Sequence, residues 1–248
     1  MVISSSLPLR PTQEPFGRRH WRGINQEGLR LRPPLLTSNT IACPRTLAVG
    51  GLHKGQLRRF EAIVRSDPDL MQLLVRVRGV GLPQWRLVAG CLYQTVWNVL
   101  SGHDRGTGIK DYDIIYFDDS DLSWAAEDRV IRRIAAATRG CVGPVEVRNQ
   151  ARVHLWFEGR FGTAYPRLRS ADESIRRYAS IVHAIGVRLE DDDRLDVVAP
   201  FGLHDLFSMV IRPNYVLENA ISHTRKAQRA QAIWPEVIVV PWKDKECD

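Results

Sequence analysis

The sequence predicts an α+β (α/β) protein, a mixed β-sheet flanked by helices in a single domain with additional C-terminal helices. Short apolar segments typical of strands lie at residues 86–90, 112–117 and 145–156, and segments with helical spacing of apolar residues separate them. The chain has 248 residues, 44% of them hydrophobic and 25% charged, which is the composition of a globular protein with a substantial core. We find no internal repeat.

Two helices are predicted before the first strand. The first covers residues 56–65, where apolar residues recur at helical spacing. The second covers residues 69–78 and follows Asp67 and Pro68, which suit the N-cap and the first helical position. Gly79 ends it, because glycine is the residue that most often terminates a helix.

The first strand, residues 86–90, turns at Gly90 into a helix over residues 92–100, with Gly102 just beyond its end. After a polar, glycine-rich loop, residues 112–117 form the second strand, an apolar run rich in β-formers.

The next three elements are a helix, a strand region and a second helix. Asp121 is the expected N-cap of a helix that runs to about Thr138. Residues 145–156 alternate like one or two strands. Residues 170–173 form a capping box that begins a helix reaching about Val182.

The last part of the chain combines a hairpin, two helices and a strand. Residues 187–189 and 195–198 are the expected strands of the hairpin, whose turn is the acidic segment 190–193. Two helical patterns follow, and residues 237–240 form a final strand.

The positive charge of the chain lies almost entirely at its N-terminus. The formal net charge is +7, and residues 1–56 carry eight basic side chains against only Glu14 and Glu27. This stretch is also rich in serine and proline, so we predict that residues 1–55 are a disordered basic leader, 56–243 the folded domain and 244–248 a tail. A transit peptide and an RNA-binding tail remain alternatives for the leader.

Composition also narrows the location and class of the protein. No apolar run approaches the ~20 residues of a membrane helix, so we expect no membrane association. The four cysteines lie far apart, which argues against a structural zinc site and against a disulfide framework, and favours a cytoplasmic protein. The cysteines are Cys43, Cys91, Cys141 and Cys247.

Three carboxylates are the strongest candidates for catalytic or metal-binding residues. Residues two apart in a strand share a face, so Asp111 and Asp113 point the same way, and Glu146 interrupts the apolar pattern of the next strand. Carboxylates so placed repel each other until a divalent cation binds, and Mg²⁺ takes one or two of them together with substrate phosphates. A third acid permits two ions that bridge attacking and leaving oxygens. For each acid alone, a solvated loop charge or an arginine pair remains open, and Asp196 is a reserve candidate for the third acid.

Phosphate-binding groups are predicted beside these acids. The Gly90–Cys91 turn lets backbone amides approach a phosphate, and the start of the following helix adds donors and partial positive charge. Arginines suit bidentate phosphate binding, although a polar strand face with ordinary ion pairs is an equal alternative. The full nucleotide-binding set is Gly90, Cys91, Lys110, Arg148, Asn149 and Arg152.

These motifs, in this order, resemble the DNA-polymerase-β-like nucleotidyltransferase superfamily, and more closely a bacterial nucleotidyltransferase-like family once filed as a domain of unknown function. The resemblance covers roughly residues 57–242. It rests on the segments AGCLYQTVWNVLSG, KDYDIIYFDDSDLSW, VEVRNQARVHLW, GVRLEDDDRLDVVAPFGLHDLF and IWPEVIVVPW.

The resemblance implies the nucleotidyltransferase fold and metal-dependent transfer of a nucleoside monophosphate from an NTP. It assigns Asp111 and Asp113 to the metals, Glu146 to the third acid, and Gly90–Cys91 to the phosphate turn. Two departures matter: Cys91 replaces the usual Ser or Gly, and Tyr93–Gln94 replaces the Arg-Asp of the tRNA-end-adding and poly(A) branch. The acceptor, a small molecule, a protein hydroxyl or an RNA end, is therefore not assigned, and neither is the oligomeric state.

The leading hypothesis is a Mg²⁺-dependent nucleotidyltransferase. The main alternative is a non-catalytic nucleotide-binding or protein-interaction module on the same fold. A metal-dependent glycosyltransferase also uses an Asp-x-Asp motif, but there the apolar run typically precedes the acids, whereas here residues 114–117 follow them.

Overall fold

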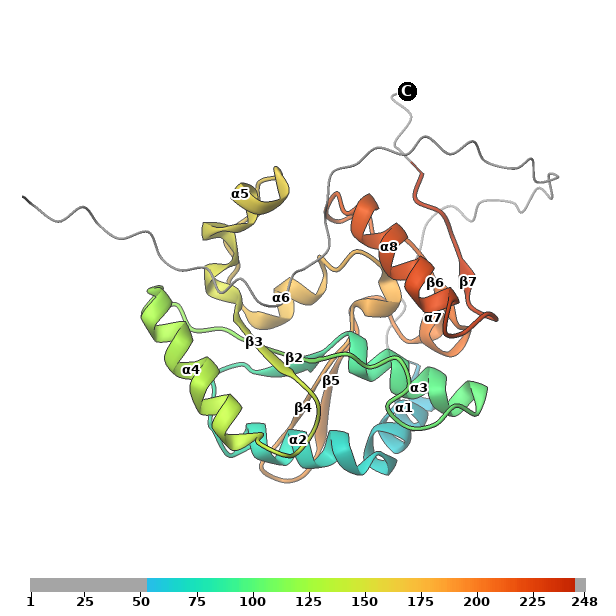
Figure 1. Cartoon of the computed structure of the whole chain (residues 1–248), viewed down its shortest axis with the longest axis horizontal. Coiled ribbons are helices and arrows are strands. Elements are labelled where there is room, and N and C mark those ends of the chain that lie inside the picture. The colour runs from blue at the N-terminus through green and yellow to red at the C-terminus, as the bar shows by residue number, and fades with distance from the viewer. Residues whose placement is uncertain (1–52, 244–248) are drawn as a thin grey trace, which may run out of the picture. The chain divides into compact units, whose positions relative to one another are not determined.

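The computed structural model describes residues 53–243, and the predictions for residues 1–52 and 244–248 lie outside these. A five-stranded mixed sheet with the strand order β3-β2-β1-β4-β5 forms its centre (Figure 1). Strands β2 and β3 are parallel, and the other neighbours are antiparallel. The predicted mixed sheet flanked by helices is confirmed. The strands are β1 (Arg86–Val88), β2 (Tyr112–Tyr116), β3 (Val145–Asn149), β4 (Gly186–Leu189) and β5 (Leu195–Val198).

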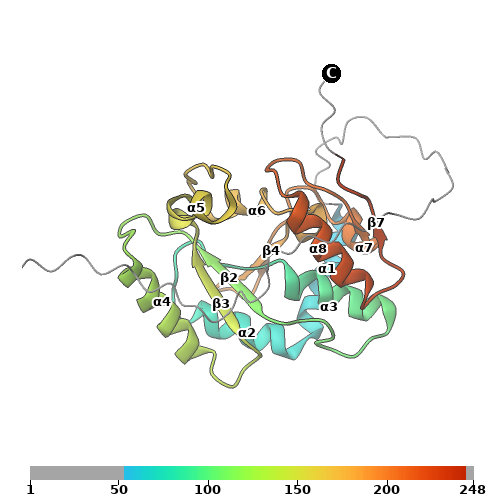
Figure 2. The ribbon, with the colours of Figure 1, turned by 45° about the horizontal axis from the view of Figure 1, so that its top comes forward.

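Four helices cover one face of the sheet, where most of the core lies. Figure 2 shows α2 and α4 along this face, and α1 and α3 pack with them. Alternate strand residues such as Leu87, Ile114 and Val147 point into this layer and are buried in one large hydrophobic cluster. The helices are α1 (Lys54–Ser66), α2 (Pro68–Arg78), α3 (Gly90–Ser101) and α4 (Trp124–Ala137).

The opposite face carries a smaller cluster and shorter elements. Val88, Ile115 and Phe117 point to this side, where they pack with Ala151 and Ile175. In both ribbon views α5 and α6 lie on this side, with α5 at its outer end (Figures 1 and 2). The elements are the 3₁₀-helices η1 (Gln150–Leu155) and η2 (Ile181–His183) and the helices α5 (Phe157–Phe161) and α6 (Ala171–Ile175).

The C-terminal part is held against α3 by tryptophans. Trp234 is fully buried, its ring meets Trp97 edge-on at 5.5 Å, and its indole N–H donates to Asn98 at 3.2 Å. A Cβ at Gly108 would lie 2.6 Å from the Trp234 ring, so this loop passes directly against the indole. The elements here are α7 (His204–Phe207), α8 (Ala220–Gln231) and a parallel pair, β6 (Val210–Ile211) and β7 (Ile238–Val239).

Several local predictions are confirmed. The Asp67 carboxylate accepts from the amides of Asp69 and Leu70, with Pro68 at the first helical position. Gly102 ends α3 with a φ of 68°. The hairpin of β4 and β5 forms around its acidic turn. Helix α1 begins at Lys54, two residues before its predicted start.

Three boundary predictions are wrong. Helix α4 is capped by Ser123, whose hydroxyl accepts from the Ala126 amide, while Asp121 instead accepts from the Ser123 amide. The strand region from residue 145 ends at Asn149, because that side chain accepts from the Ala151 amide and turns the chain into η1.

The helix that begins after Ser170 also ends early, at Ile175. The Ser170 hydroxyl does cap it by accepting from the Glu173 amide at 3.1 Å. The carbonyls of Arg176 and Tyr178, however, accept from the Asn214 side chain, at 2.8 Å each, instead of from helical amides. A tertiary contact therefore replaces the next helical turn.

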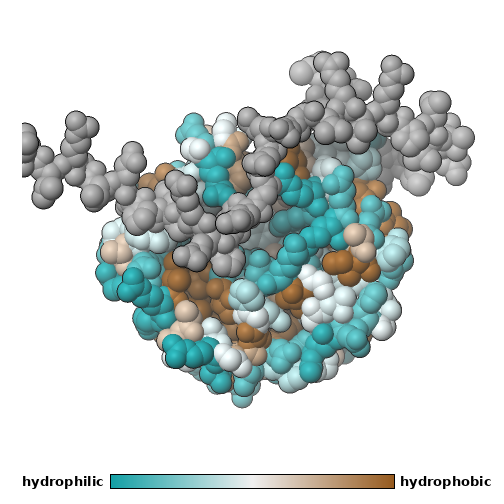
Figure 3. All heavy atoms as spheres, viewed as in Figure 1, coloured by the Kyte–Doolittle hydropathy of each residue, from teal (hydrophilic) through white to brown (hydrophobic). Residues whose placement is uncertain are grey.

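The surface is largely polar around its periphery. On the side seen in Figure 3, hydrophilic side chains dominate the edge of the described part, and apolar ones show mainly near its centre. None of the helices within residues 53–243 is both long and apolar enough to cross a membrane.

Candidate active site

The three predicted acids lie on one face of the sheet. Asp113 on β2 is directly beside Glu146 on β3 and beside Val88 on β1, in register. Because neighbouring residues in register point the same way, Asp113 and Glu146 share the face opposite α1–α4, and Asp111, two residues before Asp113, lies on it too. The structure thus brings together the carboxylates that the sequence separates by up to 35 positions.

Asp111 and Glu146 make ionisation of Asp113 less favourable. Burial and then the neighbouring Asp111 raise the pKa of Asp113 from 3.8 to about 6, with Glu146 adding to the rise. Lys226 and Arg148 act in the opposite direction. The side of the sheet that carries Asp113 is therefore a site where added positive charge is favourable.

We call Asp111, Asp113 and Glu146 the acid row. Its carboxylate oxygens are suitable ligands for a hard divalent cation. Carboxylate oxygens are the protein ligands that Mg²⁺ takes, usually one or two of them with waters and substrate phosphates completing its shell. Within residues 53–243, no three His, Cys, Asp or Glu side chains converge into a ready-made metal cage. Asp111 and Asp113 are the pair that would hold such an ion.

The turn from β1 into α3 has the backbone expected of a phosphate-binding turn. Ala89 has φ 55° and ψ −110°, a conformation that a non-glycine residue adopts only when its surroundings impose it. Within residues 53–243, no atom beyond the adjoining backbone lies within 4 Å of a Cβ added at Gly90, so there is open space beside it. The amides of Leu92 and Tyr93 bond to the Ala89 carbonyl, which leaves the first amides of α3, among the described residues, for an anion.

Cys91 contributes only its backbone to this turn. The side chain is fully buried, and its thiol donates to the Val88 carbonyl at 3.8 Å. Burial and then the nearby Asp113 carboxylate raise the pKa of the thiol well above its ordinary value. The turn and the acids are therefore neighbours, and the thiol is an un-ionised core group.

Lys226 on α8 is a candidate site residue that the sequence did not reveal. The residue as a whole is exposed, but the protein around its amine disfavours the charged form and lowers its pKa, while the carboxylates of Asp113 and Asp111 act to raise it. One turn later, the Arg229 guanidinium donates to the carbonyl of Gly108, at 3.4 Å, in the loop that leads to Asp111. In sequence, Lys226 sits among other charges on an amphipathic helix, which is the pattern of a solvated face.

Arg148 and Lys110 flank the acids. Arg148 follows Glu146 on β3, and its guanidinium lies 3.8 Å from the Glu146 carboxylate with 43% of the side chain exposed. That is an ion pair at long range rather than a hydrogen bond. Lys110 is exposed immediately before Asp111.

Two residues of the predicted nucleotide-binding set have structural partners instead. Arg152 is buried in an ion pair with Glu127, donates to the Leu122 carbonyl and lies over the Trp124 ring. Asn149 is buried, and its amide group joins the backbone of Asp118 to that of η1. Both residues therefore have structural roles, since they join β3 and η1 to α4 and to the Asp118 backbone, and they are not part of the proposed site.

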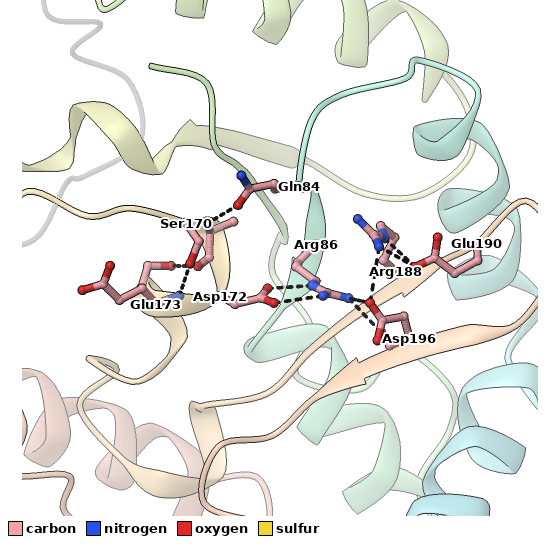
Figure 4. Close-up of polar contacts among 10 residues, drawn as sticks. Gln84, Arg86, Ser170, Asp172, Glu173, Arg188, Glu190 and Asp196 are labelled. Carbon is pink, nitrogen blue, oxygen red and sulfur yellow. Dashed lines mark hydrogen bonds and ion pairs between the residues drawn. The ribbon is translucent and has the colours of Figure 1, made fainter. Parts of the chain in front are cut away.

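Asp196, the reserve third acid, is also paired. It lies on β5, three strands away from β2, and accepts from Arg86 at 2.7 Å and from Arg188 at 3.4 Å (Figure 4). Arg86, itself buried, makes two further bonds to Asp172, at 2.8 and 3.0 Å. This network ties β1 to β5 and α6 and leaves Glu146 as the third acid of the row.

Two further side chains near the row have no sequence signal. Tyr178 packs against the small cluster on the face that carries Asp113, and burial and then the Asp113 carboxylate raise the pKa of its phenol well above the ordinary value. His183 is 1% exposed, its ring centroid lies 5.0 Å from that of Tyr93, and neither ring nitrogen has a partner among the described residues. Burial, together with Lys226, lowers the pKa of His183 well below its ordinary value.

The fold and this row of acids together define the nucleotidyltransferase class of protein. A solved structure described as a CCA-adding enzyme head domain superposes with a TM-score of 0.59, over 75% of this chain and 96% of that one, at 23% identity. The sequence model of the family described as Nucleotidyltransferase matches residues 75–239, so the chain belongs to this family and the predicted resemblance is confirmed. No protein with a curated description matches the chain.

Proposed function

We propose that this protein uses Mg²⁺ to transfer a nucleoside monophosphate from an NTP to an acceptor hydroxyl. The row of Asp111, Asp113 and Glu146 beside the N-terminus of α3 carries the proposal, because it combines a cation site with an anion site. Family membership and fold support nucleotide transfer as the type of reaction. The cation and the residue roles are inferred from the chemistry of the side chains.

The NTP would bind with its phosphates between three groups of this chain. The amides of Gly90 and Cys91, at the start of α3, suit the terminal phosphates, and the N-terminal end of the α3 dipole adds to their attraction. The carboxylate of Asp113 acts electrostatically on Lys226, which would meet the phosphates from the α8 side. Mg²⁺, when bound by Asp111 and Asp113, supplies the charge that neutralises the phosphates and polarises the α-phosphorus.

Glu146 is placed to serve the acceptor. It flanks Asp113 in register on the neighbouring strand, so an acceptor hydroxyl beside the α-phosphate lies within its reach. The hydroxyl oxygen forms a bond to the α-phosphorus, the bond to the bridging oxygen of the β-phosphate breaks, and pyrophosphate leaves with the electron pair. The hydroxyl proton passes to Glu146 and then to water.

Asp111→Asn together with Asp113→Asn tests this proposal. The full-length protein is incubated with MgCl₂ and each of the four α-³²P-labelled NTPs, with a cell extract as the source of acceptors, and labelled products and pyrophosphate are measured. We expect transfer in the wild type and at least a ~10³-fold loss in the double variant, since the removed charges act directly on the reacting phosphate.

The matched control is Asp191→Asn with Asp192→Asn, two exposed acids in the turn between β4 and β5. It removes the same charge and should keep wild-type activity. Equal activity in both double variants, or no dependence of any NTP reaction on Asp111 and Asp113, would overturn the proposal.

A non-catalytic nucleotide-binding module is the second candidate, and one observation favours it. The Arg148 guanidinium lies 3.8 Å from Glu146, so the third acid already has a neighbouring cation. Equilibrium dialysis with Mg²⁺ and each NTP separates the two functions. Binding that requires Asp111 and Asp113 without any release of pyrophosphate identifies a binding module.

A further inference from the structure

The positive charge of the described chain is concentrated in residues 148–169, which we call the α5 segment. It contains five arginines and one acid, Glu158, whereas the rest of residues 53–243 carries 22 basic and 22 acidic side chains. Arg152 is buried against Glu127, whereas the other four arginines keep solvent-exposed surface. Of these, Arg148 and Arg167 lie 3.8 and 3.9 Å from the carboxylates of Glu146 and Asp119. The arginines are Arg148, Arg152, Arg160, Arg167 and Arg169.

The same segment holds a cluster of aromatic rings outside the core. Phe157 lies 4.6 Å from both Phe161 and Tyr165, and 6.1 Å from Trp156, measured between ring centroids. No residue of α5 is buried, and Phe161 is 48% exposed. Figures 1 and 2 show α5 standing away from the sheet. A partly exposed aromatic cluster of this kind, with Phe161 at its surface, is typical of a ligand-binding surface.

Aromatic side chains continue from α5 to the proposed active site. Tyr165 and Tyr178 both pack against the small cluster on the face that carries Asp113. The Arg177 guanidinium lies 5.9 Å from the Tyr165 ring centroid. Tyr178 packs in the cluster that contains Val88, and Val88 is in register with Asp113 on the neighbouring strand. The line Phe157, Tyr165, Tyr178 therefore leads from the exposed rings to the acids.

Rings alternating with arginines match the chemistry of unpaired nucleotides. Bases stack on aromatic side chains, and each stacked base is worth about 1–3 kcal/mol, while guanidinium groups bind the phosphates between them. A duplex keeps its bases paired and stacked, so their faces are not available to aromatic side chains. The surface fits single strands because both of its components are present along one path.

We propose that the α5 segment binds single-stranded nucleic acid and directs its terminal hydroxyl to Glu146 and Asp113 as the acceptor of nucleotidyl transfer. This inference rests on the proposed function and adds the acceptor class to it. The strand gains one nucleotide through a new bond from its terminal oxygen to the α-phosphorus, and pyrophosphate is released. RNA and DNA share the phosphates and bases that the segment would contact, and the 2′-hydroxyl is what separates them.

Phe161→Ser combined with Arg167→Glu tests the binding surface in the full-length protein. Fluorescence anisotropy with labelled 12-nucleotide RNA, the same sequence as DNA, and a 12-base-pair duplex measures the dissociation constants. We expect the single strands to bind the wild type, with at least a ~10-fold weaker affinity in the variant, as loss of one stacked base and reversal of one phosphate contact imply.

The matched control is Ile221→Ser combined with Arg132→Glu, which changes an exposed apolar residue on α8 and an exposed arginine on α4. Both proteins keep the basic leader, so any contribution from residues 1–52 is equal in the two. Equal affinities in the two variants, or tighter binding of duplex than of single strands, would overturn the proposal. Loss of self-association in the α5 variant, with strand binding unchanged, would assign the surface to an interface between copies instead.

Extension of the labelled strand by one nucleotide links the surface to the active site. The α5 variant should lose extension and keep Mg²⁺-dependent NTP binding, whereas Asp113→Asn should keep strand binding and lose extension. Transfer to another acceptor without any strand binding refutes this inference alone. Absence of any reaction that requires Asp113 refutes the proposed function.

Discussion

The two faces of the five-stranded sheet differ in what they contain. The face covered by α1–α4 is apolar and continuous with the large core, with Leu87, Ile114 and Val147 pointing into it. The other face has a smaller cluster and carries the acids Asp113 and Glu146, together with Arg86 and Arg148. Alternation along each strand assigns these opposite characters to neighbouring residues. Burial of the first face stabilises the fold, whereas the like charges held together on the second face destabilise it.

The covered face should show the largest effect of a single substitution. Trp97 is fully buried, and its indole N–H donates to the Leu206 carbonyl at 2.9 Å. Trp97→Ala leaves a cavity and an unpaired carbonyl, so we expect the free energy of unfolding to fall by about 3–5 kcal/mol. Urea unfolding followed by circular dichroism measures it, and a loss under 1 kcal/mol would mean that this layer is not the main core.

The acid face should become more stable when its central charge is removed. The pKa of Asp113 is about 6 in the folded protein against an ordinary value of 3.8, so the folded state binds more protons between these pH values and its stability falls as pH rises from about 4 to about 6. Asp113→Asn removes that cost. Without Mg²⁺, we expect the variant to gain up to about 3 kcal/mol at pH 7.5 and to match the wild type near pH 4.

Thermal unfolding at both pH values, with and without MgCl₂, checks this expectation. Mg²⁺ should raise the melting temperature of the wild type more than that of Asp113→Asn. A variant less stable than the wild type at pH 7.5 would show that Asp113 holds the fold rather than the site.

The ion pairs of Arg86 stabilise the face that carries the acids. Its buried guanidinium joins Asp172 and Asp196 (Figure 4). Arg86→Met keeps the apolar length of the side chain but leaves two acids facing each other, so we expect a loss of about 2 kcal/mol in urea unfolding. Arg78→Met, which removes an exposed pair with Asp193, is the matched comparison and should cost under ~1 kcal/mol.

The strained turn between the two faces should show the smallest effect. Ala89 has a positive φ of 55°, so Ala89→Gly relieves strain and should stabilise the protein by about 1 kcal/mol. Ala135→Gly, in the exposed middle of α4, should instead destabilise it by about 1 kcal/mol. Differential scanning calorimetry of the two variants gives the signs, and a loss in both would mean that Ala89 is not strained.

Much of this protein was predictable from local chemistry. The period of apolar residues and the Asp67, Gly102 and Ser170 signals placed most helices and strands, because caps and turns depend on neighbouring residues only. The errors at Asp121, after Asn149 and after Ile175 arose where a competing local or tertiary hydrogen bond decided the boundary.

In the candidate site, too, some residues could be predicted from the sequence and others could not. Asp111 and Asp113 were predictable as a pair because a strand fixes which residues share a face. Arg152 and Asn149 were not separable from true phosphate ligands, because only their partners, Glu127 and the Asp118 backbone, show that they are structural.

The sequence by itself determined the fold class, the family and the row of acids, since these depend on spacing along the chain. Only the tertiary structure decided which charges serve the row. Lys226 comes 113 positions after Asp113 in the sequence, and its charge acts on Asp113 because Trp234 packs the C-terminal part against α3 and the Gly108 loop. Packing between distant segments sets that proximity, and no local pattern records it.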